Sequence, residues 1–181
     1  MSDPEVCILK PSPNFDARKD GERDISFIVL FDTGSNNCCG DLARLRNPAS
    51  GVGSHYLVDR EGRIYQLVAD KDRAWCSVRD SQGAPQVDLG EKALVISLVN
   101  DGSGYTPYPA PQYRALLKLV KRLMARYGIP PNSLDYHEKK RVRHAGRLHF
   151  DLESFRQETK DELPSVFPPE PASPAAPLPA V

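Results

Sequence analysis

The sequence has no excess of charge of either sign, because 24 lysine and arginine residues balance 24 aspartate and glutamate residues in a chain of 181. A balanced composition lacks the basic surface that attracts nucleic acid, so we expect no nucleic-acid partner. No apolar run approaches the length that crosses a bilayer, so we expect no membrane span. These absences exclude polyanion-binding and membrane-spanning classes.

The N-terminus has no recognisable signal peptide, because MSDPEVCILKPSP lacks a basic start followed by an apolar stretch. The sequence therefore predicts a cytoplasmic protein. Cysteine is scarce, and Cys7, Cys38, Cys39 and Cys76 show no CxxC spacing. In a reducing compartment such cysteines are expected to be free thiols.

The length suits one domain with a sizeable core. Proline, alanine and serine dominate the chain from about residue 164 onward. Such a composition buries too little apolar area to offset the entropy of ordering. We therefore expect a folded domain over residues 6–156 and a disordered tail over residues 157–181.

Strands and helices are predicted in mixed order along the domain. Residues 111–127 form the clearest helix, because apolar side chains recur at three- and four-residue steps and Gly128 follows as a stop. Short helices are predicted at 41–46 and within 148–157, and strands at 25–31, 54–58, 63–68 and 92–99. This order predicts an α/β fold in which helices flank a central sheet.

Several segments in order carry a family resemblance. The most specific is 47–75, NPASGVGSHYLVDREGRIYQLVADKDRAW, and the others are 11–18, 27–34, 94–100 with Tyr136 and His137, and 150–156. The chain resembles the zinc-dependent N-acetylmuramoyl-L-alanine amidases, which share a fold with peptidoglycan-recognition proteins. The resemblance implies a mixed central β-sheet flanked by helices, and cleavage of the bond between muramic acid and the first L-alanine of the stem peptide.

Such an amidase needs three zinc ligands with an open fourth position, a glutamate as general base and a cationic donor for the oxyanion. Carried over to this sequence, the first ligand position is Phe31, and the second is His137. The third falls near His144, within His144-Ala145-Gly146. The base position is Ser97, and Arg143 is the nearest equivalent of the oxyanion donor.

Phenylalanine has no lone pair for a metal, and serine is a poor proton acceptor at neutral pH. The resemblance therefore implies a scaffold with an eroded zinc site and no cofactor, a pseudo-enzyme that binds a muropeptide or a protein partner. The alternative is an active amidase with a rebuilt zinc centre, in which Asp32 or Cys76 joins His137 and His144. Side chains alternate along a strand, so Asp32 is expected to point away from Phe31.

Three further residues are candidates for ligand binding. His55 resembles a histidine near the family's site, although a hydrogen-bonded histidine beneath the cleft fits the same pattern. Arg73 and Trp75 could contact a sugar or peptide, although Trp75 could equally cap the core. A third hypothesis is an interaction module that docks through the basic stretch 139–144 and the proline-rich tail.

Overall fold

The computed structural model describes residues 7–76, 78–79, 85–86, 91–137 and 150–160. Its helices are α1 (Cys38–Leu45), α2 (Ala110–Tyr127) and α3 (Leu152–Glu158). The strands are β1 (Cys7–Leu9), β2 (Phe15–Ala17), β3 (Phe27–Asp32), β4 (Tyr56–Val58), β5 (Ile64–Gln66), β6 (Asp72–Ala74), β7 (Val78–Arg79), β8 (Pro85–Gln86), β9 (Ala93–Leu98) and β10 (Leu134–His137).

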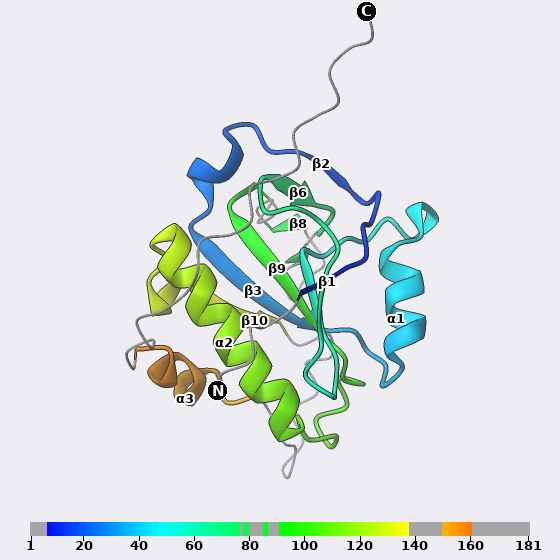
Figure 1. The fold of residues 1–181 in the computed structure, drawn as a ribbon, viewed down its shortest axis with the longest axis vertical. Helices are drawn as coiled ribbons and strands as arrows, with labels where there is room; N and C mark the ends of the chain where they lie inside the picture. The colour runs from blue at the N-terminus through cyan, green and yellow to red at the C-terminus, as the bar shows by residue number, and fades with distance from the viewer. Residues whose placement is uncertain (1–6, 77, 80–84, 87–90, 138–149, 161–181) are drawn as a thin grey trace, which may run out of the picture.

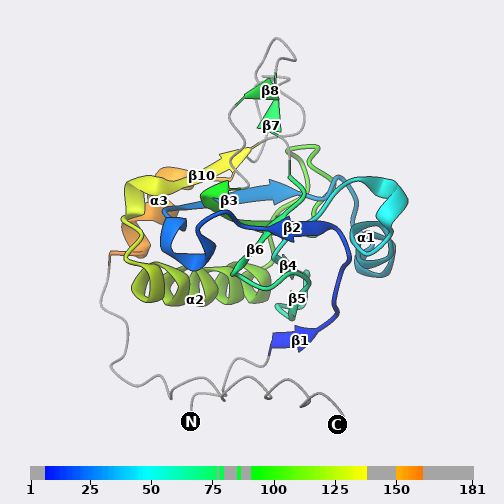
Figure 2. The same ribbon diagram turned by 90° about the horizontal axis from the view of Figure 1, so that it is seen from above.

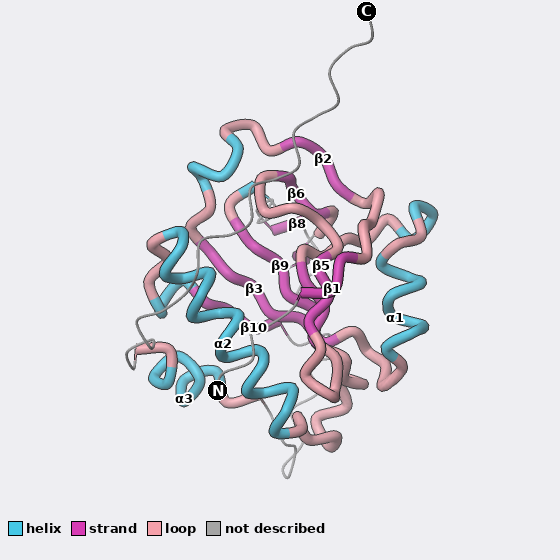
Figure 3. Tube along the Cα trace, viewed as in Figure 1, coloured by secondary structure: helices cyan, strands magenta, loops and turns pink. Residues whose placement is uncertain are grey.

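Six strands form the central sheet in the order β1-β5-β4-β9-β3-β10 (Figure 1). β4 and β5 pair antiparallel, whereas the other neighbours are parallel. The predicted mixed sheet flanked by helices is therefore confirmed. Figure 3 shows the strands grouped in the centre, with α2 and α3 on one side and α1 on the other.

The main core lies between the sheet and α2, which covers one face (Figure 2). The α2 side chains Leu116, Leu119, Val120 and Leu123 pack with sheet residues that include Ile28, Leu30, Leu94, Ile96 and Leu98. A second cluster joins Leu45 of α1 to Leu57, Tyr65, Leu67 and Val99. None of the helices in the described ranges is both long and apolar enough to span a bilayer.

The structure corrects several of the predicted elements, and the short strands β1, β2, β6, β7 and β8 were not predicted. α1 starts at Cys38 rather than residue 41, because the Asn37 side chain accepts a hydrogen bond from Gly40 N and caps the helix. β10 was not predicted, since its four residues show no alternation. α3 ends at Glu158, beyond the predicted domain end at 156, and Tyr113 Oη donates to Glu158 Oε1 at 2.7 Å. Residues 161–181, which hold most of the predicted tail, lie outside the described residues.

Candidate functional site

Three neighbouring strands bring the main sequence candidates together. Phe31 of β3 is in register with Ser97 of β9 on one side and with His137 of β10 on the other. Residues in register on adjacent strands point to the same face of a sheet. Leu30 and Ile96 face α2, so Phe31, Ser97 and His137 face the opposite way. The positions taken from the family resemblance therefore form one contiguous row.

The Phe31 ring lies against the imidazole of His137. The ring centroids are 5.3 Å apart and the planes differ by 18°, which is a stacked arrangement. Both side chains are half-buried. The aromatic ring therefore occupies the place beside His137 where the family resemblance puts a metal ligand.

The Nε2 atom of His137 is close to a carboxylate but makes no hydrogen bond within the described residues. Its Nε2 atom lies 3.2 Å from Asp135 Oδ2, but the angles are not those of a hydrogen bond. This buried nitrogen has no hydrogen-bond partner among the described residues. An imidazole in this state can offer a lone pair or an N–H to a ligand.

Ser97 is buried and bonded to another serine. Its hydroxyl donates to Ser54 Oγ at 3.0 Å, and Ser54 Oγ lies 2.8 Å from Tyr56 O and 3.1 Å from Val95 O. These carbonyls only accept hydrogen bonds and cannot take a proton from a hydroxyl, so nothing in this chain of hydrogen bonds makes Ser97 a base. Its position fits a packed polar contact between β9 and the start of β4.

Asp32 lies on the opposite face, as strand alternation predicts. Its carboxylate accepts hydrogen bonds from Tyr108 Oη at 2.8 Å and from Tyr136 Oη at 2.5 Å. Burial and the negative charge of Asp32 raise the pKa of Tyr108, so this phenol remains a donor. Asp32 therefore links β3, β10 and the loop before α2, and it points away from the row formed by Phe31, Ser97 and His137.

The donors in the described residues do not fit a three-ligand zinc ion. No group of three histidine, cysteine, aspartate or glutamate side chains in the described ranges is arranged to hold a metal. Phe31 supplies no donor, Asp32 faces away, and Cys76 is a half-buried thiol that forms no disulfide. His144 and Arg143, the other residues of the predicted site, lie outside the described residues.

His55 lies in the core rather than on a binding surface. It is fully buried, and its Nδ1 atom accepts from Val95 N at 2.9 Å. The neutral ring therefore carries its proton on Nε2, which donates to Asp72 O at 3.0 Å. Burial, and next the nearby Arg18 guanidinium, lower the pKa of His55 to about 3. This geometry fits the hydrogen-bonded interpretation of His55.

Arg18 was not predicted as a functional or structural residue, although it is buried beside His55. Its guanidinium donates to three carbonyl oxygens, those of Asp70, Glu91 and Ala93. These acceptors come from segments far apart in sequence. The one sequence signal for Arg18 is that it lies in segment 11–18, which resembles the family. No local sequence pattern predicts the three contacts of its guanidinium.

Arg73 and Trp75 lie near the antiparallel pair of β2 and β6. Arg73 Nη2 contacts Asp16 Oδ2 at 2.8 Å, and Nη1 lies 3.7 Å from Glu91 Oε1. The Trp75 main chain donates to Asn14 O and accepts from Gly53 N at 2.6 Å. Both side chains are half-buried, so they are accessible to a ligand, and their predicted role in binding remains a prediction.

Known proteins are similar to this chain in both sequence and fold. The N-acetylmuramoyl-L-alanine amidase family (Amidase_2) matches residues 21–161. The amidase AmiD of Escherichia coli K12 is 32% identical over 48% of this chain and 36% of its own length. The 1,6-anhydro-N-acetylmuramyl-L-alanine amidase AmpD of Salmonella typhimurium LT2 is 25% identical, over 70% of this chain and 75% of AmpD. The matched part of this chain thus spans about a third of the length of AmiD.

Solved structures agree with this assignment. AmiD from E. coli in complex with anhydro-N-acetylmuramic acid-L-Ala-D-γ-Glu-L-Lys superposes with a TM-score of 0.60 at 28% identity, covering 75% of this chain and 57% of that one. A selenomethionine derivative of AmpD gives a TM-score of 0.65 at 24% identity, covering 87% and 99%, and shows the fold alone. The family match covers most of the chain and includes the row formed by Phe31, Ser97 and His137, so the chain belongs to the N-acetylmuramoyl-L-alanine amidase family.

Proposed function

We propose that this protein binds a muropeptide in the cleft of the amidase fold without the zinc-dependent hydrolysis of the family. The stacking of Phe31 on His137 carries this proposal, because a ring without a donor stands at the first ligand position. A metal site that loses one of three protein ligands loses much of its affinity.

The base position supports the same conclusion. Ser97 replaces the carboxylate that the resemblance implies, and its hydroxyl is already bonded to Ser54. General-base catalysis typically contributes 10²–10⁴-fold to rate. The metal and the base are therefore changed together, which leaves the scaffold without its two main sources of rate.

The choice of ligand rests on similarity to characterised relatives. The AmiD structure holds an anhydro-muropeptide, and AmpD is described as an amidase of 1,6-anhydro-N-acetylmuramyl-L-alanine. In this chain Phe31 and His137 present a half-buried aromatic surface, and the Arg73 guanidinium, which is paired with Asp16, lies elsewhere in the same domain. Such groups suit a ligand that carries sugar rings and carboxylates.

A second candidate is an active amidase with a rebuilt centre, and the His137 Nε2 atom, which makes no hydrogen bond in the described part of the chain, favours it. In that case His137, His144 and Cys76 would hold zinc, which would supply an activated water. The same cleft could instead receive a protein partner, and that outcome is included in the test below.

The test joins metal analysis, calorimetric binding and a cleavage assay on the purified full chain. We expect less than stoichiometric zinc, saturable binding of anhydro-N-acetylmuramic acid-L-Ala-D-γ-Glu-L-Lys, and no release of the free tripeptide over hours. Stoichiometric zinc with release of tripeptide would establish the active amidase instead. Absence of both binding and cleavage would leave only a protein partner.

Restoring the site provides a second arm. The double variant Phe31→His with Ser97→Glu should gain measurable zinc affinity, because Phe31, Ser97 and His137 are aligned on one face. The control is Phe27→His, which places an imidazole at an exposed position of the same strand. Equal zinc content in the double variant and the control would show that the site has been placed wrongly.

A further inference from the structure

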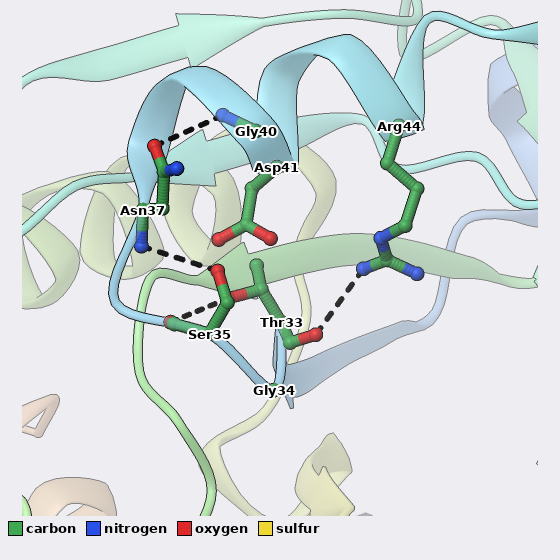
Figure 4. Close-up of a pocket in the computed structure, with 7 residues that line it drawn as sticks. All are labelled: Thr33, Gly34, Ser35, Asn37, Gly40, Asp41 and Arg44. Atoms are coloured by element: carbon green, nitrogen blue, oxygen red, sulfur yellow. Dashed lines mark hydrogen bonds between the residues drawn. The ribbon is translucent and has the colours of Figure 1, made fainter.

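An open hollow of about 480 Å³ lies where the chain leaves β3 and enters α1. Thr33 and Ser35 come from the loop, and Asp41 and Arg44 come from the helix (Figure 4). Thr33 is two residues beyond Phe31 in the chain. The hollow is therefore close in sequence to the row described above, but it uses none of the residues in that row.

The Asp41 carboxylate points into this hollow, as Figure 4 shows. The residue is only 3% exposed, and its Oδ2 atom has no hydrogen-bond partner in the described part of the chain. Two backbone donors beside it are engaged elsewhere, since Gly40 N donates to Asn37 Oδ1 and Asn37 N donates to Ser35 Oγ. Burying a carboxylate oxygen without a hydrogen-bond donor is unfavourable. A ligand that brings an N–H donor to the Asp41 carboxylate would therefore stabilise it.

Arg44 supplies the opposite charge one turn further along α1. Its Nη2 atom donates to Thr33 O at 3.3 Å. Within the described ranges Arg44 makes no ion pair within 4.0 Å, with Asp41 or with any other carboxylate, so most of its five N–H groups remain available. Residues three apart share a helix face, so a cationic and an anionic group line one hollow without neutralising each other directly.

We propose that this hollow binds an amino-acid end that carries both an ammonium and a carboxylate, with the ammonium at Asp41 and the carboxylate at Arg44. The lysine end of a stem peptide has this chemistry, so the inference rests on the proposed function and names the part of the muropeptide that this chain selects. A metal ion fits less well, because a single carboxylate beside a guanidinium makes a weak cation site.

Binding of four probes to the full chain, measured by calorimetry, tests the inference. The probes are anhydro-N-acetylmuramic acid-L-Ala-D-γ-Glu-L-Lys, the same compound with an acetylated ε-amine, the same compound with a C-terminal amide, and the shorter compound without lysine. Charge-assisted hydrogen bonds of this kind contribute enough for acetylation to weaken binding by the wild-type protein about tenfold or more.

Two variants then test whether the ligand's ammonium lies at Asp41 and its carboxylate at Arg44. Asp41→Asn should weaken binding of the unmodified probe about tenfold and should make acetylation of the amine inconsequential. Arg44→Gln should also weaken binding of the unmodified probe about tenfold. Amidation of the probe's carboxylate should then have no further effect on affinity. The matched control is Glu153→Gln on α3, which removes an exposed carboxylate and should bind all four probes as the wild-type protein does.

Two different failures can be told apart. If the probe without lysine binds as tightly as the full probe, or if acetylation changes affinity less than twofold, the hollow is not the lysine site and muropeptide binding stands. If no probe binds, the proposed function fails and this inference fails with it. Since the modified probes are tested on the wild-type protein, a variant that folds poorly leaves the test intact.

Discussion

At the scale of single residues, burial decides what an ionisable side chain can do. His55 was a candidate ligand-binding residue, yet both of its ring nitrogens serve protein partners in the core. Phe31 shows the reverse, because a residue type that usually packs in a core lies half-buried and stacked on His137, at the position where the family resemblance implies a metal ligand. Residue identity therefore indicates the chemistry available, and surroundings decide whether it is used.

His55 should make stability depend on pH. Its pKa is about 3 in the folded protein, against about 6.5 in the unfolded chain, so the unfolded chain binds more protons between these values. Stability is therefore present above pH 6.5 and is lost as the pH falls. Between pH 7 and pH 5 we expect a loss of about 2 kcal/mol from this group, measured by urea unfolding.

The variant His55→Gln should be less stable than the wild-type protein at pH 7 and should lose less stability on going to pH 5. His137→Gln is the control, because it removes a half-exposed imidazole and leaves the buried one. If the wild-type protein and His55→Gln show equal pH dependence, His55 is not a buried neutral imidazole.

At the scale of elements, three main-chain segments approach one another closely beside β2, β4 and β6. Gly53, which precedes β4, donates to Trp75 O and lies against the main chain of Asn14. A Cβ atom at residue 53 would lie 2.2 Å from Asn14 O and 2.8 Å from Trp75 N. Only glycine at residue 53 leaves room for these three segments to pack this closely. Their main-chain hydrogen bonds fix the position of the Trp75 backbone.

Gly53→Ala should therefore destabilise the protein by about 4 kcal/mol or more, or prevent folding, because backbone atoms cannot move aside as side chains do. Gly128→Ala is the matched control. Gly128 ends α2 with φ of 65°, and a Cβ there meets no atom within 4 Å. Its cost should be about 1 kcal/mol, from the left-handed backbone alone. Similar unfolding midpoints for the two variants would contradict this account.

At the scale of the whole molecule, α3 completes the core. Phe155 is fully buried and packs with Phe150 and Tyr113, and Arg156 donates to the carbonyl oxygen of Leu134, the first residue of β10. The C-terminal end of the domain therefore supports the strand that carries His137. The predicted end at residue 156 cuts this helix.

A chain that ends at residue 160 should unfold within about 0.5 kcal/mol of the full chain, because the composition of residues 161–181 offers little to a core. A chain that ends at residue 150 should lose at least the contribution of Phe155, about 3–5 kcal/mol, which the variant Phe155→Ala estimates independently. Chemical denaturation of the three proteins measures both values. Equal stability of the two shortened chains would show that α3 does not belong to the core.

Periodicity and apolar runs predicted β3, β9 and α2, because each carries a local pattern long enough to identify it. The buried face of α2 was predicted less well. Gln112 is buried, and its Nε2 atom donates to Val58 O and Val99 O. A polar residue is expected at the surface, so the sequence did not predict this burial. β10 has only four residues and takes its structure from pairing with β3. Short elements depend on partners that a local pattern does not contain.

The sequence alone determined the family, the mixed sheet with its long helix, and the residue types at the positions where the resemblance implies a metal ligand and a base, because these follow from local order along the chain. Only the tertiary structure decided that Phe31 covers His137, that Asp32 belongs to a tyrosine network on the other face, and that Asp41 reaches a hollow without a partner. These relations join residues distant in sequence, or depend on the direction in which a side chain points. Packing and strand register determine both.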